Sequence, residues 1–461
     1  MPMTGEDYRE SLQDGRVIYY DGKRIDDVTI HPKTRSMVDI VASTYDSEDQ
    51  ERREGRFSLP RSVEELRLKM DDFIQWDDLL AASILGFLTL RTVSHRMADD
   101  MQIYRQRMAD WNKHCKDDNI RLTICLTDAK GDRAVRPSRQ ADPDSYLRVV
   151  DQTPDGIVIN GAKLHATGAA ISHELLVFPT KRMSSEESQW AVACAVPVNS
   201  PGLTILNAVP GPHHEEFENH PFSRHHIYPE GFAVFDHVFV PNERVFLNGE
   251  VEHSATFPHS LGLWQRIGGS AKMAEEADML VGLAHLLAEE NGLGRIPHIK
   301  DKLAEMILHA TMVRAALEAA ISNAEFTDEG YATPSELYTN AAKYYGSTNL
   351  SRMLNHIHDI AGGSVLTVPL SGDLDNPEIA PYLEKYMSTK PEGNGAYRTK
   401  LMQSARDITA SGYAGTWQVR VLLGGGGLYA QKLVASHHYD VNRAKALALE
   451  ATGLGAFNGT S

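Results

Sequence analysis

The chain has 461 residues, of which 42% are hydrophobic, so it can bury a large core and form two or three domains. A formal net charge of −16 argues against nucleic acid as a general partner, because the phosphate backbone would be repelled. No apolar run reaches membrane-spanning length, and the amino terminus lacks a basic segment followed by an apolar one. We therefore expect a soluble, cytoplasmic enzyme. The cysteines agree with a reduced compartment, since they match neither a disulfide framework nor a zinc motif: Cys115, Cys125 and Cys194.

Three regions of different composition predict three domains. Residues 1–126 carry apolar side chains at three- and four-residue spacing after a short strand-and-turn opening, which predicts helices. Residues 127–257 are rich in Val, Ile, Pro and Gly and alternate in polarity, which predicts strands. Residues 258–461 return to helical spacing, with Gly292 and Pro297 separating two long segments. Helices, then strands, then a helical bundle is the expected order.

Individual elements can also be predicted. We expect helices where apolar residues recur on one face, over residues 62–90, 97–118, 271–292 and 299–326. We expect strands where polarity alternates between turn residues, over residues 145–152, 156–167 and 173–180.

A polar, arginine-rich loop precedes these strands. Gly131 frees backbone groups there, beside the charged side chains of Lys130, Asp132 and Arg133. Basic side chains beside free amides suit an anionic cofactor tail. The second strand ends in Thr167, which places a hydroxyl just before a flexible glycine. The segment predicts an edge prepared for a phosphate-bearing ligand, although a solvated loop beside an ordinary β-meander would have the same composition.

The segment from residue 131 to 180 resembles the central region of the flavoprotein family that joins 4-hydroxyphenylacetate 3-hydroxylases to 4-hydroxybutyryl-CoA dehydratases. Further resemblance lies in EGFAVFDHVFVPNERVF at residues 230–246, and in residues 359–386 and 412–432. It covers nearly the whole chain. The resemblance implies an acyl-CoA dehydrogenase-like fold, mainly α with a central β-barrel-like domain, and FAD as the cofactor.

The resemblance also implies where the cofactor binds. In the family, the loop at the position of residues 130–133 touches FAD, and the threonine at the position of Thr167 bonds near N5 of the flavin. The family closes its flavin site, often across a subunit contact, where this chain has Gly424, Gly425, Gly426 and Gly427. This glycine run has no evident partner in its own bundle, and the C-terminal helices are long and apolar. We therefore expect the homotetramer that is usual in the family.

The dehydratase branch carries a 4Fe–4S cluster, which needs thiolate ligands. An ungapped match from Glu230 onward places Gln265 and Lys272 where the dehydratases have a histidine and a cysteine. No cysteine precedes Cys115, and Arg420 matches the dehydratases' catalytic glutamate. We therefore expect no iron–sulfur cluster and no cluster-dependent dehydration.

The hydroxylase branch uses FADH2 from a separate reductase to hydroxylate a phenol. Its substrate pocket has an arginine followed four residues later by a tyrosine; here Arg91 matches the arginine and His95 replaces the tyrosine. Ile124 replaces the pocket histidine, and the segment at residues 219–224 resembles a hydroxylase segment. We predict that Arg91 and His95 are catalytic. The substrate-binding set comprises Arg91, His95, Ile124, Pro179 and Thr180.

Several of these residues have structural interpretations as well. His95 can act as a base near neutral pH, or be a hydrogen-bonded histidine at the end of a buried helix. Arg91 can bind an anionic group, or be a cation at a helix C-terminus. The histidine-rich stretch over residues 213–226 fits no standard metal spacing, so we expect a lid or entrance loop and no metal site.

Three functions remain open from the sequence. The first is an FAD-dependent monooxygenase, the oxygenase component of a two-component system, which hydroxylates a small aromatic or anionic substrate. The second is a redox-neutral or dehydrogenating flavoenzyme on an acyl-CoA-type substrate, such as an isomerase or a cluster-free lyase. The third is a flavin-free binding protein. The resemblance favours the first.

Overall fold

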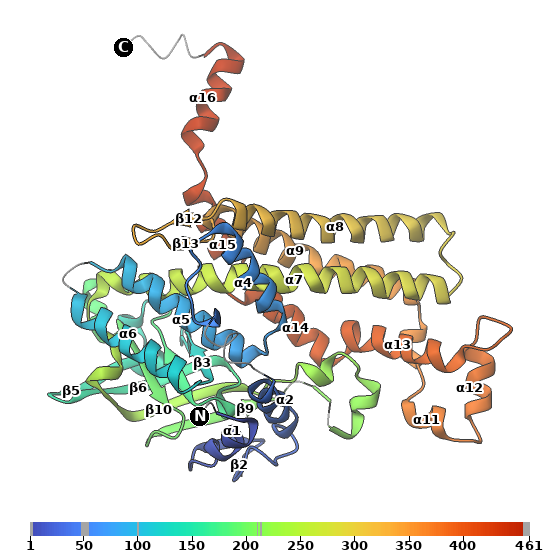
Figure 1. The fold of residues 1–461 in the computed structure, drawn as a ribbon, viewed down its shortest axis with the longest axis horizontal. Helices are drawn as coiled ribbons and strands as arrows, with labels where there is room; N and C mark the ends of the chain where they lie inside the picture. Colours follow the sequence, from blue (N-terminus) through green and yellow to red (C-terminus); the bar gives the residue numbers. More distant parts are fainter. Residues whose placement is uncertain (1–2, 48–54, 99–100, 210, 213, 455–461) are drawn as a thin grey trace.

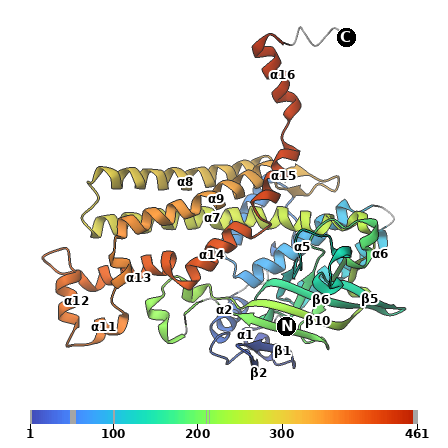
Figure 2. The same ribbon diagram turned by 180° about the vertical axis from the view of Figure 1, so that it is seen from behind.

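The molecule combines a β-rich centre with long helices, which Figures 1 and 2 show from opposite sides. The computed structural model describes residues 3–47, 55–98, 101–209, 211–212 and 214–454. It is 58% helical, so the predicted mainly α architecture with a central β-domain is confirmed. Among the residues that the structure describes, no helix is both long enough and apolar enough to cross a membrane.

The first region is helical after its strand-and-turn opening, as expected. The helical segment predicted over residues 62–90 is divided in two: Trp76, in an extended conformation, ends the first helix, and Asp77 caps the second by accepting from the amides of Leu79 and Leu80. The elements are α1 (Gly5–Ser11), β1 (Val17–Tyr20), β2 (Lys23–Ile25), α2 (Arg35–Asp46), α4 (Val63–Gln75), α5 (Asp78–Arg96) and α6 (Gln102–Asp117).

The central region contains two sheets that share one apolar core. One sheet has the order β2-β1-β9-β10-β6-β4, with β5 also paired to β6, and the other has the order β11-β8-β7-β3. The three predicted strands are confirmed as β5, β6 and β7. The bounds are β3 (Leu122–Cys125), β4 (Thr127–Asp128), β5 (Arg148–Thr153), β6 (Gly156–Thr167), β7 (Glu174–Val177), β8 (Val192–Pro197), β9 (Leu203–Ala208), β10 (Glu230–Pro241) and β11 (Val245–Asn248).

The N-terminal opening belongs to the first of these sheets. Strand β1 runs parallel to β9, with Ile18 beside Ile205, and both side chains are fully buried. Helix α4 packs in a second apolar core that it shares with the C-terminal helices, and α5 contributes side chains to both cores. The division into residues 1–126, 127–257 and 258–461 stays a proposal.

The C-terminal region is a bundle in which α7, α8 and α9 lie side by side, while α16 projects away from the body (Figure 1). Its helices are α7 (Thr256–Glu290), α8 (Pro297–Ser322), α9 (Glu336–Ala361), α10 (Ser364–Thr367), α11 (Ser371–Asp375), α12 (Ala380–Met387), α13 (Gly395–Ala410), α14 (Gly412–Leu423), α15 (Leu428–His438) and α16 (Val441–Thr452). A short hairpin, β12 (Glu325–Phe326) and β13 (Ala332–Thr333), joins α8 to α9.

A buried ion pair holds the short strand β4 against β6. Lys163 is 1% exposed and Asp128 is 2% exposed, and their charged atoms lie 2.7 Å apart. Lys163 Nζ also donates to the carbonyls of Leu126 and Phe178, and Asp128 accepts from the amide of Leu147. The pair therefore gathers the ends of several strands just before the arginine-rich loop begins.

Lys163→Met should destabilise the protein by about 3–5 kcal/mol, because it leaves the carboxylate of Asp128 buried without its charge partner. The double variant Lys163→Met/Asp128→Leu should recover most of that loss, since it removes both charges together. Urea unfolding of the two variants measures this, with the exposed Lys300→Met as the control. Equal losses in the single and double variants would contradict the assignment of the cost to an unpaired charge.

Candidate active site

A chain of five side chains connects the three regions of the molecule. Thr167, the last residue of β6, donates to Glu230 Oε2 at 2.7 Å, and Glu230 opens the neighbouring strand β10. Arg420 of α14 donates to Glu230 Oε1 at 2.9 Å and to Asp78 Oδ2 at 3.2 Å. Asp78, in the first turn of α5, also accepts from Lys272 Nζ of α7 at 3.0 Å. Positive and negative groups thus alternate from the β-domain to the bundle.

The charges in this chain are matched to one another. Burial alone would raise the pKa of Asp78, but the charges of Lys272 and Arg420 outweigh it and hold that pKa well below its usual range. Burial would lower the pKa of Arg420, but the charges of Asp78 and Glu230 raise it. The four charged side chains are between 24% and 36% exposed to solvent. These four side chains are therefore partly open to solvent.

Two further titratable side chains lie near this chain of charges: Glu276 of α7 and Lys343 of α9. Glu276 follows Lys272 by one helical turn and accepts from Trp417 Nε1 at 3.2 Å, and burial raises the pKa of Glu276 to about 7. Burial lowers the pKa of Lys343 to about 8, and its Nζ donates to the Val421 carbonyl at 2.8 Å. Both groups change charge near neutral pH, as a proton donor or acceptor must.

The histidine-rich stretch is anchored close to these titratable side chains, although its first residue lies outside the described part of the chain. Asp407 of α13, which is 1% exposed, accepts from His220 Nδ1 at 3.0 Å and from the amide and hydroxyl of Ser223 at 2.9 and 2.7 Å. His226 stacks on Tyr413 with ring centroids 6.1 Å apart, and burial lowers the pKa of His226. The predicted role of this stretch as a lid or entrance loop stays a prediction.

The arginine-rich loop makes a sharp turn. Lys130 and Gly131 are both left-handed, with φ of 74° and 50°, and a Cβ at Gly131 would lie 2.4 Å from Gln140 Oε1. The amide of Lys130 donates to the Ser145 carbonyl at 2.8 Å, and the amide of Asp132 donates to Gln140 Oε1 at 2.9 Å. The protein itself thus uses two of the amides that were expected to serve a ligand.

What the loop offers an anionic ligand is its side chains. Arg133 is exposed, and Lys130 is half-buried, with its pKa lowered by burial and by the charge of Arg133. Arg136 is paired with the buried carboxylate of Glu187. Lys130 and Arg133 are therefore better placed than Arg136 to meet an anionic ligand.

Helix α5 continues through Arg91 and His95, so the two side chains lie one turn apart, as expected. Arg91 is half-buried and His95 is exposed. At 1.5 Å per residue, Arg91 lies about 20 Å further along α5 than Asp78. The described contacts do not bring Arg91 or His95 to the charged chain around Thr167, and their catalytic roles stay predictions.

The other predicted substrate residues lie in the β-domain. Ile124 of β3 is half-buried and packs between the two apolar cores. The threonine before it donates to the Thr167 carbonyl at 2.8 Å, so β3 reaches the candidate site. Pro179 is buried, and Thr180 Oγ1 donates to the Leu126 carbonyl at 2.6 Å. The Thr180 hydroxyl therefore already has a partner within the protein.

The glycine run packs against α7 of its own bundle. Gly425 and Gly426 have φ of 77° and 93°, and their carbonyls accept from Arg266 Nε at 2.8 Å and from Gln431 Nε2 at 2.9 Å. A Cβ at Gly425 would lie 3.0 Å from the Arg266 side chain. The expectation that this run lacks a partner in its own bundle is therefore wrong, because its partner lies 159 positions away in the sequence.

The positions where the dehydratases hold cluster ligands carry other chemistry here. Lys272 is ion-paired with Asp78, and Gln265 is half-buried on α7. Cys125 and Cys194 lie on strands that flank β7, and burial raises the pKa of both thiols to about 12. Those thiols are held as neutral side chains of the β-domain core. The absence of a cluster stays a prediction.

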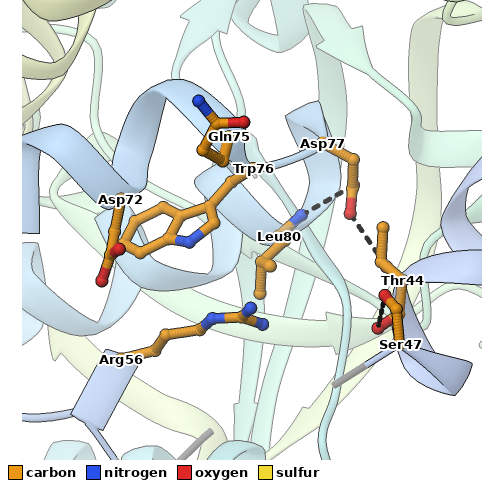
Figure 3. A pocket seen from close by; sticks show the side chains of 8 residues that line it. All are labelled: Thr44, Ser47, Arg56, Asp72, Gln75, Trp76, Asp77 and Leu80. Carbon is orange, nitrogen blue, oxygen red and sulfur yellow. Dashed lines mark hydrogen bonds between the residues drawn. The ribbon is translucent and has the colours of Figure 1, made fainter. Parts of the chain in front are cut away.

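A cavity of about 370 Å³ lies beside the start of α5 (Figure 3). Asp77 faces it and accepts from Thr44 Oγ1 at 3.1 Å. Two carboxylates and one guanidinium in its lining do not suit an anionic cofactor tail, so we do not include it in the candidate site. Its lining residues are Thr44, Ser47, Arg56, Asp72, Gln75, Trp76, Asp77 and Leu80.

Sequence patterns did not single out Asp78, Glu230 or Glu276. Asp78 stands beside Asp77 at a helix start, where a carboxylate is ordinary. Glu230 opens an alternating strand, and Glu276 lies in an amphipathic helix. Arg420 did carry a signal, since it replaces a glutamate expected from the resemblance, but only the fold shows its partners.

Glu276 should make stability depend on pH. Its folded pKa of about 7 lies above the ordinary glutamate value of 4.5, so its stabilising effect is fully present below about pH 4.5 and is lost as pH rises to about 7. Relative to Glu276→Gln, the wild-type free energy of unfolding should fall by about 2–3 kcal/mol between pH 5 and pH 8. Urea unfolding at both pH values measures this, with Glu275→Gln, one residue earlier and more exposed, as the control. Parallel profiles for wild type and Glu276→Gln would refute the shift.

Comparison with known proteins places this chain in a family. Models described as 4-hydroxyphenylacetate 3-hydroxylase N terminal and C terminal match residues 4–247 and 254–453. The 4-hydroxybutyryl-CoA dehydratase/vinylacetyl-CoA-Delta-isomerase of Clostridium aminobutyricum is 26% identical, over 98% of this chain and 100% of that protein. The oxygenase component of 4-hydroxyphenylacetate 3-monooxygenase from Geobacillus sp. (strain PA-9) is also 26% identical, over 89% of this chain and 88% of that protein.

Solved structures agree with the sequence relatives. A crystal structure of the oxygenase component of 4-hydroxyphenylacetate 3-monooxygenase, complexed with FAD, matches with a TM-score of 0.86 and 25% identity, over 98% of this chain and 99% of that chain. The chain therefore shares the fold of this oxygenase component, with the expected order of helices, strands and a helical bundle. Because the two family models together span most of its length, the chain belongs to the 4-hydroxyphenylacetate 3-hydroxylase family.

Proposed function

We propose that this protein is an FAD-dependent monooxygenase, the oxygenase component of a two-component system, which hydroxylates a small aromatic or anionic substrate. The observation that carries the proposal is the pairing of Lys272 with Asp78 at 3.0 Å. The resemblance places a cluster cysteine of the dehydratases at this position, and an ammonium group bound to a carboxylate cannot ligate iron. Of the family's two reactions, hydroxylation is the one that needs no cluster.

The residues present fit FAD. Lys130 and Arg133 supply positive side chains for its phosphates, Thr167 supplies a hydroxyl at the junction of β-domain and bundle, and the run from Gly424 to Gly427 offers backbone without side chains. We place FAD between the β-domain and the C-terminal helices, in contact with these groups. When bound in its reduced form, it supplies two electrons for the reaction with molecular oxygen.

The chain's own groups can orient a ligand and move a proton there. Glu230 accepts from the Thr167 hydroxyl and so fixes its direction. Glu276, with its pKa raised by burial to about 7, can hold a proton at neutral pH and release it. We assign the binding of an anionic substrate group to Arg91, which matches the arginine of the hydroxylases, and proton transfer to His95, which replaces their tyrosine and can act as a base near neutral pH.

Two partners follow from this proposal: a flavin reductase that supplies FADH2, and further copies of the chain. Exposed apolar side chains on α15 and α16 support a homotetramer: Tyr429 at 74%, Leu433 at 52%, Val441 at 47% and Leu447 at 52% exposure. Light scattering should give the mass of four chains. A stable monomer that still binds FAD tightly would contradict a flavin site shared between subunits.

A redox-neutral or dehydrogenating reaction on an acyl-CoA-type substrate, such as an isomerisation or a cluster-free lyase step, is the second candidate. It is favoured by the dehydratase relative, which aligns over its full length. Iron and acid-labile sulfide assays on anaerobically purified protein test for an iron–sulfur cluster. A cluster would indicate dehydration as in the dehydratases, whereas neither the monooxygenase nor the cluster-free reaction on an acyl-CoA-type substrate needs one. We expect both assays near zero; stoichiometric iron would restore cluster-dependent dehydration.

Replacing Arg133 and Thr167 together by alanine should weaken FAD binding by roughly tenfold or more, because it removes a phosphate cation and the hydroxyl near the flavin. Calorimetric titration with FAD measures the affinity. Arg139→Ala, an exposed cation of the same loop, is the matched control. Unchanged FAD affinity in the double variant would contradict the proposed binding of FAD beside Arg133 and Thr167.

His95→Asn should reduce product formation by roughly 10²-fold or more, the usual size of a general-base contribution, while FAD affinity stays unchanged. Arg91→Ala should raise the KM for an anionic substrate. Normal turnover in both variants would make this pair structural and move the substrate site towards the chain around Thr167.

The function itself is tested by mixing protein and reduced FAD with oxygen in the presence of a panel of phenols. A monooxygenase gives a hydroxylated product and a spectral transient before oxidised flavin appears. Slow reoxidation without product would favour the second candidate. An absence of flavin binding would indicate a binding protein.

A further inference from the structure

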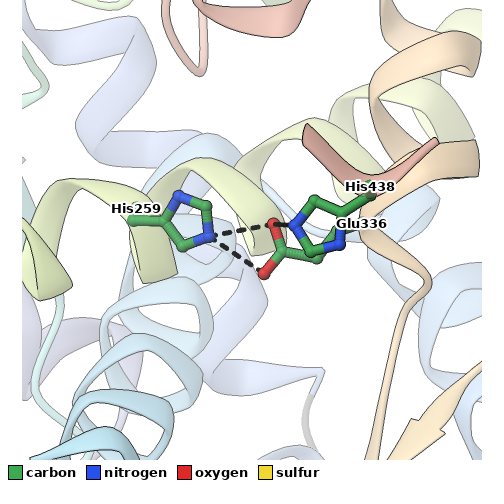
Figure 4. Close-up of side chains that lie close together, drawn as sticks. All are labelled: His259, Glu336 and His438. Atoms are coloured by element: carbon green, nitrogen blue, oxygen red, sulfur yellow. Dashed lines mark hydrogen bonds and ion pairs between the residues drawn. The ribbon is translucent and has the colours of Figure 1, made fainter. Parts of the chain in front are cut away.

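Three side chains from three helices converge where α15 meets the bundle (Figure 4). His259 lies in the first turn of α7, Glu336 is the first residue of α9, and His438 is the last residue of α15. Glu336 Oε2 lies 2.9 Å from His259 Nε2 and 3.7 Å from His438 Nε2. We propose that this cluster binds a divalent transition-metal ion of the Zn²⁺ class.

The carboxylate is already prepared as a ligand. Glu336 is 4% exposed, and burial alone would raise its pKa, but the hydrogen bond from His259 and the charge of Arg96 help to lower that pKa to about 2. Arg96 Nη2 donates to Oε1 at 2.8 Å, and His259 Nε2 lies 2.9 Å from both Oε1 and Oε2, so the carboxylate is held in place facing the histidines. An outer partner that fixes a ligand in this way is a regular feature of metal sites.

The spacing of the donors suits a metal ion. All three ligand atoms lie within 4.8 Å of one another. An ion bound at about 2.0–2.2 Å from each donor requires the donors to be roughly 3.0–3.5 Å apart, so small side-chain rotations are enough. The histidine side chains are 38% and 30% exposed, which leaves an open side for a water ligand. Two imidazoles and one carboxylate select a transition metal over Mg²⁺ or Ca²⁺.

A metal-free ion-pair cluster is the alternative, and it accounts for only part of the geometry. Arg96 and His259 both make hydrogen bonds to Glu336. His438 directs Nε2 to the same carboxylate at 3.7 Å, beyond hydrogen-bond distance, so that contact stabilises little by itself. A metal ion bound by all three side chains would explain why His438 faces Glu336 without hydrogen-bonding to it. The positive charge of Arg96 lowers the affinity but leaves the geometry intact.

A bound ion would fasten α15 to α7 and α9. His438 is the last helical residue before the chain continues into α16, and α15 directly follows the glycine run. The metal would therefore have a structural role, because it would hold α15, and with it the start of α16, against the bundle. The ligands lie far apart in the sequence, which is why no metal motif is visible there.

The test uses full-length, untagged protein freed of metal with a chelator and titrated with Zn²⁺ alone, and with Co²⁺ as a spectroscopic probe. We expect one Zn²⁺ per chain, visible Co²⁺ bands of a site with nitrogen and oxygen ligands, and a higher melting temperature with Zn²⁺. His438→Ala and His259→Ala should each weaken binding by at least about tenfold, since even outer partners of metal ligands contribute that much.

His437→Ala is the matched control, because His437 neighbours His438 and packs edge-on against its ring without reaching Glu336. It should bind Zn²⁺ as the wild type does. His438→Gln serves if the alanine variant unfolds. Absence of binding, or equal binding by wild type and both ligand variants, would overturn the proposal, as would binding that is lost only when histidines of the 213–226 stretch are replaced.

Discussion

Arg420 is the side chain on which the junction of the three regions depends. It donates to Asp78 of the N-terminal helices and to Glu230 of the β-domain, while its own backbone belongs to α14 of the bundle. A guanidinium can do this because its donors form a planar fork that serves two carboxylates at once. Removing one partner from such a partly buried group costs more than the contact itself, because the remaining charges keep their desolvation penalty. The relative placement of the regions and the local electrostatics are therefore coupled.

The pKa values of two carboxyl groups near this junction are shifted in opposite directions. Asp78 faces two cations, which hold its pKa low and keep it ionised. Glu276 is half-buried beside an indole donor, and burial raises its pKa to about 7. Neighbouring groups with separated pKa values are a common basis for dividing structural and proton-transfer roles in a site. By this criterion Asp78 supports the framework, and Glu276 is the group free to change charge.

The local part of this structure could be read from the sequence, and the long-range part could not. Alternating polarity predicted β6 over the residues that the structure gives it, and Gly292 and Pro297 separate α7 from α8 as expected. The resemblance supplied the family and the fold, and it predicted a flavin contact for Thr167. Arg420 and Asp78, however, lie 342 positions apart, and no periodicity or motif links residues at such a distance. The same limitation produced the wrong expectation for the glycine run, whose partner Arg266 belongs to a different helix.

The parallel pairing of β1 with β9 has a consequence for how the protein is made. Ile18 emerges from the ribosome early, but its neighbour Ile205 follows much later, after roughly 10–40 s at ordinary synthesis rates. During that interval β1 can pair with β2, which follows it directly, but its other edge has no partner strand. Parallel strands joined through so long a connection form slowly, because the entropy of closing the loop must be overcome first. The β9-facing edge of β1 is therefore open to pairing with other strands until β9 has been synthesised.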